Sequence, residues 1–131
     1  MKKSLLALLL PLCLMSYEQN VPILDWAKRH NLFHQNYFQT NEENFIRLVK
    51  EGQSPQTLFI GCSDSRVIPE LITQSDPGDI FVIRTAGNFV PTNDLSPIDG
   101  VEATIQFGVE VVKVKEIIVC GHTHCAAIDG V

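Results

Sequence analysis

Three short apolar runs in the middle and C-terminal parts of the chain predict buried β-strands. They are residues 57–60 (TLFI), 80–83 (IFVI) and 116–120 (EIIVC). Each run is rich in β-branched or aromatic residues and is nearly continuous rather than alternating, a pattern typical of strands that are buried on both faces. We therefore expect the three segments to form a parallel sheet whose two faces are both covered.

Apolar residues at helical spacing predict two helices before the first strand. The first helix begins near Val21. The second could be capped by Thr40 or Asn41, carries glutamates in its first turn and should end at Gly52.

A further helix is expected between the second and third strands. Apolar residues recur at helical spacing over 101–112, and Ser96 followed by Pro97 offers an N-cap and a first helical residue. The order strand, helix, strand implies right-handed crossovers. The predicted fold class is therefore α/β, a mainly parallel β-sheet flanked by helices.

The first 16 residues differ from the rest of the chain. Two lysines precede an apolar run from Leu5 to Met15, which is too short to span a bilayer as a helix. This is the pattern of a secretory signal peptide, and it predicts a periplasmic or secreted protein. The alternative is that the segment stays on the chain as a buried part of a cytoplasmic protein.

Composition and charge narrow the class of protein. The chain has 131 residues, of which 45% are hydrophobic and 19% charged, and this suits one compact globular domain over residues 17–131. The formal net charge is −5, and lysine and arginine form no stripe along the chain. Nucleic-acid binding is therefore not expected.

Metal-binding residue types directly follow two of the predicted strands. Cys62 and Asp64 come after the first strand, and His122 and Cys125 come after the third. Ligand sites in α/β sheets lie at the carboxyl ends of strands, so these side chains should meet at one edge. Thiolate and imidazole are preferred ligands of zinc, and Asp64 could complete the tetrahedron or stand just outside it. His124 is adjacent to Cys125 and should point elsewhere.

Arg66 is placed to control Asp64. The arginine lies two residues after the aspartate, a spacing that allows a bidentate ion pair. Held by Arg66, Asp64 would stay off the metal and accept a hydrogen bond from water. Released, it could take the open ligand position and close the site.

Zinc binding is not the only interpretation of this chain. In an oxidising compartment Cys62 and Cys125 could form a disulfide instead of binding zinc. Nucleotide binding is not favoured, because no G-x-G-x-x-G sequence opens a helix. Cys120 lies inside an apolar run and is predicted to be a small buried hydrophobic residue.

Three motifs resemble those of the β-class carbonic anhydrases in order and spacing. They are CSDSRV at 62–67, PGDIFVIRTAGN at 77–88 and GHTHC at 121–125, and the similarity runs from about Tyr37 to the last residue. The resemblance implies a β-carbonic-anhydrase-like fold with its C-terminal part missing. Residues 17–131 would then be the N-terminal portion of such a domain.

The resemblance also implies a function. It predicts a carbonate dehydratase, a lyase that hydrates carbon dioxide reversibly to bicarbonate by attack of zinc-bound hydroxide, with one Zn²⁺ per chain. The zinc ligands would be Cys62, His122 and Cys125, with Asp64 and Arg66 as the catalytic dyad. The family's substrate-pocket positions are occupied here by Gln53, Phe81, Ala86 and Phe107. The resemblance also implies a homodimer or higher homo-oligomer. The alternative to the enzymatic function is a truncated zinc-binding domain without turnover.

Overall fold

The computed structural model describes residues 22–92 and 99–130. The predicted signal peptide over residues 1–16 lies outside this part of the chain. Within the described residues, no helix combines the length and the apolar character needed to cross a membrane.

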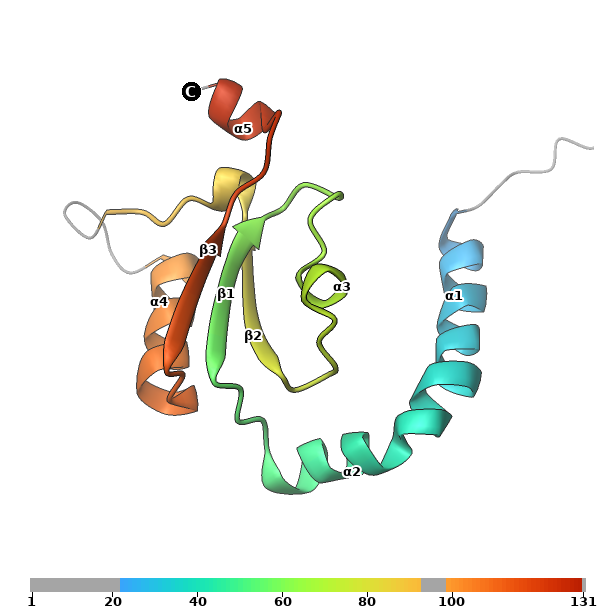
Figure 1. Ribbon diagram of the computed structural model, residues 1–131. Helices are drawn as coiled ribbons and strands as arrows, with labels where there is room; N and C mark the ends of the chain where they lie inside the picture. The colour runs from blue at the N-terminus through green and yellow to red at the C-terminus, as the bar shows by residue number, and fades with distance from the viewer. Residues whose placement is uncertain (1–21, 93–98, 131) are drawn as a thin grey trace, which may run out of the picture.

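A three-stranded parallel sheet forms the centre of the fold (Figure 1). Its strands are β1 (Thr57–Cys62), β2 (Ile80–Thr85) and β3 (Glu116–Cys120), arranged in the order β2-β1-β3. Thr57 pairs with Ile80 on one side and with Glu116 on the other, so all three strands start at the same edge of the sheet. The three predicted strands and the α/β fold class are confirmed.

Burial differs sharply between the central strand and the edge strand β3. In β1, Leu58, Phe59 and Ile60 are at most 3% exposed, whereas Ile117 and Val119 in β3 are 50% and 59% exposed. The prediction that every strand is buried on both faces is therefore right for β1 and wrong for β3. A continuous apolar run shows that a strand can be covered, but the packing of other elements decides whether it is.

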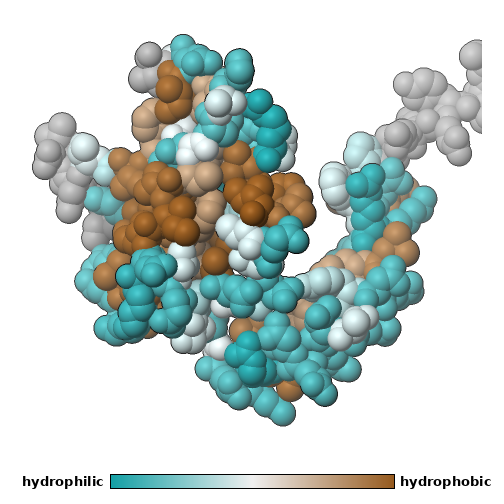
Figure 2. Space-filling view, in the orientation of Figure 1, coloured by the Kyte–Doolittle hydropathy of each residue, from teal (hydrophilic) through white to brown (hydrophobic). Residues whose placement is uncertain are grey.

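Helix α4 (Gly100–Phe107) covers the sheet over β1 and β2. Its residues Val101 and Ile105 pack against the buried cluster of Leu58, Ile60 and Ile83. Apolar side chains consequently remain at the surface over β3 and over the short helix α3 (Pro69–Thr73) (Figure 2).

The N-terminal helices form a curved arm that leads away from the sheet (Figure 1). It consists of α1 (Pro22–Leu32), a π-helical turn (Phe33–Phe38), a 3-10 turn (Gln39–Asn41) and α2 (Glu42–Glu51). Asn41 occupies the predicted N-cap of α2, but its side chain donates to the Tyr37 carbonyl instead of capping. Gly52 ends the helix as predicted, with a positive φ of 79° that glycine adopts readily.

Helix α4 begins later than the sequence predicts. Asp99 is its N-cap, and the Asp99 carboxylate accepts hydrogen bonds from the backbone nitrogens of Val101 and Glu102 at 2.8 and 2.9 Å. The backbone of Asp99 is extended, so α4 begins after it, at Gly100. The predicted cap Ser96 and first helical residue Pro97 lie outside the described residues. The helix continues beyond Phe107 as a π-helical turn (Gly108–Val112).

We expect Asp99→Ala to destabilise the chain by about 1 kcal/mol. The substitution leaves two backbone N–H groups at the start of α4 without their acceptor, and loss of an N-cap typically costs this much. Asp99→Ser, which keeps an acceptor oxygen, should recover most of the difference in urea unfolding. Equal unfolding free energies for the alanine variant and the unaltered chain would contradict the assignment of Asp99 as the cap.

Candidate metal centre

Cys62, His122 and Cys125 come together at the carboxyl edge of the sheet. Cys62 is the last residue of β1, and the other two lie in the segment that joins β3 to the short helix α5 (Ala126–Asp129). Their candidate ligand atoms all lie within 4.8 Å of one another, and both cysteines are buried. Because β1 and β3 are parallel neighbours, residues 60 positions apart meet at one point. We call these three residues the Cys-His-Cys group.

The dimensions of the Cys-His-Cys group suit zinc. The two sulfur atoms are 3.8 Å apart. Two thiolates bound to one tetrahedral zinc at about 2.3 Å each would be separated by about 3.8 Å. Two sulfur ligands and one nitrogen ligand leave a fourth position free, which is the arrangement of catalytic rather than structural zinc sites.

The imidazole of His122 has a nitrogen available for a metal. Its Nδ1 lies 3.0 Å from the carbonyl oxygen of Thr123, to which it can donate when protonated, and 3.4 Å from Nη2 of Arg66. Its Nε2 is buried and has no hydrogen-bond partner among the described residues. A buried polar atom without a partner is costly, and a zinc ion beside Cys62 and Cys125 would satisfy it.

The surroundings of Cys62 favour its thiolate form. The backbone N–H of Asp64 points at the Cys62 sulfur from 3.4 Å and is the main reason why the pKa of this thiol is lowered to about 7. Interaction with the same sulfur raises the pKa of His122 when no metal is bound. Thiolate is the form that binds zinc, so the chain prepares this ligand near neutral pH.

Asp64 and Arg66 form the predicted ion pair beside the Cys-His-Cys group. The guanidinium donates from Nε to Oδ1 and from Nη2 to Oδ2, each at 2.8 Å, and the Arg66 backbone N–H donates to Oδ1 at 2.9 Å. These contacts hold the pKa of Asp64 well below its usual range. Oδ2 of Asp64 lies 3.9 Å from Nε2 of His122, so the carboxylate stands next to the group. Arg66 also donates to the carbonyl oxygen of His124 at 3.0 Å, which ties the two ligand-bearing segments together.

Gly87 lies close to Cys62, and its backbone N–H contributes to the lowered pKa of that thiol. It has a positive φ of 67° within the 3-10 turn Ala86–Asn88. A Cβ atom there would lie 2.9 Å from the Phe89 ring and 3.2 Å from Ile128 of helix α5. A side chain at this position would therefore push on the helix that directly follows Cys125.

Helix α5 begins at Ala126, so His122 lies in the loop that precedes it. One detail of this edge differs from the sequence prediction. Cys120 is partly exposed, with its sulfur 3.6 Å from the Gly121 carbonyl oxygen, so the prediction that it is buried is wrong. It stands at the end of the edge strand, where no other element covers it completely.

The predicted pocket residues do not all lie near the Cys-His-Cys group. Ala86 does, because it follows Thr85, which pairs with Cys62 across β1 and β2. Gln53 precedes β1 and is exposed, at the opposite edge of the sheet. Phe81 and Phe107, with ring centroids 6.0 Å apart, lie toward the same opposite edge, since Phe81 pairs with Leu58 near the start of β1. One chain therefore brings only Ala86 of the four to the group.

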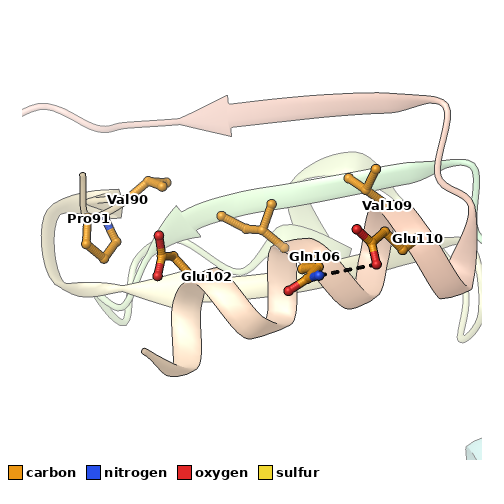
Figure 3. A pocket seen from close by; sticks show the side chains of 7 residues that line it. Val90, Pro91, Glu102, Gln106, Val109 and Glu110 are labelled. Carbon is orange, nitrogen blue, oxygen red and sulfur yellow. Dashed lines mark hydrogen bonds between the residues drawn. The ribbon is translucent and has the colours of Figure 1, made fainter. Parts of the chain in front are cut away.

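A separate hollow of about 560 Å³ lies along α4 (Figure 3). Its lining residues are Val90, Pro91, Glu102, Ile105, Gln106, Val109 and Glu110. Two of the lining residues, Glu102 and Glu110, are acidic, and Gln106 donates to Glu110 at 3.2 Å. It contains no cysteine, histidine or cation, so it does not share the chemistry of the Cys-His-Cys group.

Sequence comparison finds relatives of this chain among the carbonic anhydrases. A sequence model of the family described as carbonic anhydrase matches residues 57–131. A carbonic anhydrase of Synechocystis is 46% identical over 98 residues, covering 75% of this chain and 35% of that protein. One of Pseudomonas aeruginosa is 52% identical over 79 residues, covering 60% of this chain and 36% of that protein. The chain thus spans about a third of the length of these relatives.

Solved structures show the same similarity. The β-carbonic anhydrase CcaA superimposes with a TM-score of 0.78 at 41% identity, over 83% of this chain and 48% of that chain. One of two tetrameric β-carbonic anhydrases of Sordaria macrospora gives a TM-score of 0.68 at 34% identity, over 83% of this chain and 53% of that chain.

Proposed function

Because the chain belongs to the β class of the carbonic anhydrase family, we propose that it takes part in the reversible hydration of carbon dioxide to bicarbonate at one zinc ion. The proposed ligands are Cys62, His122 and Cys125. The observation that carries the proposal is the sulfur–sulfur distance of 3.8 Å beside the unpartnered Nε2 of His122, which together fit a zinc site with one free position.

The residues of this chain have separate roles in that reaction. Zinc, when bound, would supply a Lewis acid that lowers the pKa of water to about 7 and so provides hydroxide for attack on carbon dioxide. Cys62 and Cys125 would hold the metal as thiolates and His122 through Nε2. Asp64, kept ionised by Arg66, can only accept hydrogen bonds, so it would orient the O–H of the reacting water. Arg66 would also keep Asp64 from entering the ligand set, and its release would let the carboxylate close the site.

We infer that a second copy of the chain completes the substrate pocket. Gln53, Phe81 and Phe107 lie at the edge of the sheet opposite the Cys-His-Cys group, so one chain does not assemble them around it. In a homodimer these residues of one copy could face the zinc site of the other. The same observation favours a second candidate function, a zinc-binding domain without turnover, for a chain that stays monomeric.

Metal content and carbon dioxide hydration, measured on one purified sample of the chain, test the proposal. We expect one zinc per chain and stopped-flow hydration that a chelator abolishes and added zinc restores. Zinc without hydration would favour the inert zinc-binding domain. A folded sample that binds no zinc, and whose thiol titration shows Cys62 and Cys125 oxidised, would instead support the disulfide.

We also expect the apparent zinc affinity to fall as the pH drops below about 7. Zinc binds the thiolate of Cys62, whose pKa is lowered to about 7, so below that pH each binding event must displace a proton from this residue. The dissociation constant, measured by competition with a chromophoric chelator, should then rise about tenfold per pH unit for each proton displaced. An affinity that is constant from pH 8 to pH 6 would contradict this expectation.

A further inference from the structure

Arg84 connects strand β2 to the segment that carries Cys62 and Asp64. It lies near the end of β2, where it pairs with Gly61 of β1. Its Nε donates to the carbonyl oxygen of Cys62 at 3.1 Å, and its Nη2 donates to the carbonyl oxygen of Asp64 at 2.7 Å. Among the described residues, no carboxylate lies within ion-pair distance of Arg84. Its guanidinium instead donates to the two backbone carbonyls.

The two carbonyl groups that accept hydrogen bonds from Arg84 belong to Cys62, a proposed zinc ligand, and to Asp64, the proposed catalytic carboxylate. Only Ser63 separates them, so the guanidinium bridges the first residues after β1, and the Asp64 carbonyl also accepts from the Val67 backbone N–H at 3.0 Å. A planar guanidinium donates in fixed directions, and therefore fixes the two peptide groups relative to each other. Charged donors also make stronger hydrogen bonds than neutral ones.

The orientation of this turn decides where two functional groups point. The Asp64 N–H is aimed at the Cys62 sulfur from 3.4 Å, and the Asp64 side chain is aimed at Arg66. Rotation of the peptide groups between Cys62 and Asp64 would disturb both directions. The strand pairing here does not depend on Arg84, because the Ser63 backbone N–H donates to the Thr85 carbonyl at 2.8 Å.

We propose that Arg84 is a positioning residue of the zinc centre, whose guanidinium clamps the carbonyls of Cys62 and Asp64 and so presets the first ligand and the catalytic carboxylate. The inference rests on the zinc site of the proposed function. It differs from the usual role of an exposed arginine. Arg47 on α2, for comparison, makes a local contact to Asn44 three residues away and holds no functional segment.

Zinc affinity and cobalt spectra of Arg84→Ala, Arg84→Lys and the control Arg47→Ala test this role. Arg84→Ala should raise the zinc dissociation constant about tenfold, the lower end of what loss of a residue supporting metal ligands costs. It should also change the intensity of the visible bands of the Co²⁺-substituted protein. Lysine can donate to one carbonyl at a time, so Arg84→Lys should fall between. Arg47→Ala should match the unaltered chain within about twofold.

Unfolding and chemical rescue separate positioning from simple stability. Urea unfolding of the metal-free proteins should give similar midpoints for Arg84→Ala and Arg47→Ala, and millimolar ethylguanidinium should restore part of the zinc affinity of Arg84→Ala. The proposal is overturned if Arg84→Ala binds zinc within twofold of the unaltered chain, or if ethylguanidinium and Arg84→Lys recover nothing. An unaltered chain without zinc affinity would overturn the zinc site as well, whereas zinc binding without hydration would leave the role of Arg84 intact.

Discussion

Replacing Cys62 with serine should leave a folded chain that no longer retains zinc and no longer hydrates carbon dioxide above the uncatalysed rate. Structural zinc in zinc-finger peptides is bound with about 10–16 kcal/mol shared among four ligands, so the loss of one of only three protein ligands here should weaken affinity by at least about a hundredfold. Metal analysis after gel filtration and stopped-flow hydration would measure both effects. The serine side chain is close in size to that of cysteine, so the buried position next to Val67 stays filled.

Cys120→Ser is the matched control for this prediction. Cys120 is also a free cysteine at the end of a strand, but its sulfur is not part of the Cys-His-Cys group. This variant should keep one zinc per chain and its activity. Retention of stoichiometric zinc by Cys62→Ser, or equal losses in the two variants, would show that the metal binds elsewhere.

Replacing Asp64 with asparagine should lower the hydration rate by about a hundredfold or more while zinc stays bound. The amide has the same shape, but it carries no charge and can present a donor where the carboxylate only accepts. Acid–base groups that act on the reacting water commonly contribute about 10²–10⁴-fold. Because Arg66 holds the pKa of Asp64 well below its usual range, the carboxylate should stay ionised at neutral and mildly acidic pH. The unaltered chain should therefore show no loss of activity from protonation of Asp64 between about pH 5 and 7.

The control for Asp64→Asn is Asp76→Asn. Asp76 accepts a hydrogen bond from Tyr37 at 3.0 Å and lies before β2, at the edge of the sheet away from the Cys-His-Cys group. Its substitution should leave hydration unchanged. Loss of zinc from Asp64→Asn would indicate that this carboxylate is itself a ligand, and unchanged hydration with zinc bound would remove it from the dyad.

The Asp64–Arg66 pair should contribute little to folding stability. Its side chains are 24% and 59% exposed, and solvent screens ion pairs at such exposed positions, so they contribute little to stability. Since the folded pKa of Asp64 is depressed, this contribution is present above the unfolded pKa of about 4 and is lost as the pH falls below it. We therefore expect the ion pair to matter for the orientation of the Asp64 carboxylate rather than for the folding stability of the chain.

The parts of the fold that could be predicted are those encoded by local residue patterns. The three apolar runs identified all three strands, and Gly52 marked the end of α2. The Cys-His-Cys group was also predictable, because ligand types directly followed two parallel strands and such strand ends share an edge. The motif at 62–67 likewise placed Arg66 within reach of Asp64.

Other features depend on which helices and strands pack together. The residue pattern did not determine these features. Ile117 and Val119 are as apolar as the residues of β1, yet they stay half exposed because α4 lies over β1 and β2. In the sequence, Arg84 is a charged residue that directly follows the apolar run of β2. Only the pairing of β2 with β1 brings its guanidinium to the carbonyls of Cys62 and Asp64. Gln53, Phe81 and Phe107 could be matched to a pocket by resemblance, but the sheet places them at the edge opposite the Cys-His-Cys group.

The sequence by itself thus determined the strands, the α/β class and the candidate metal ligands, because strand propensity and ligand chemistry belong to individual residues and their near neighbours. Tertiary structure alone decided the burial of β3, the unpartnered Nε2 of His122, the lowered pKa of Cys62 and the contacts of Arg84. Each of these depends on distances and on backbone directions that are set only when the strands are aligned and the loops after them take their conformation.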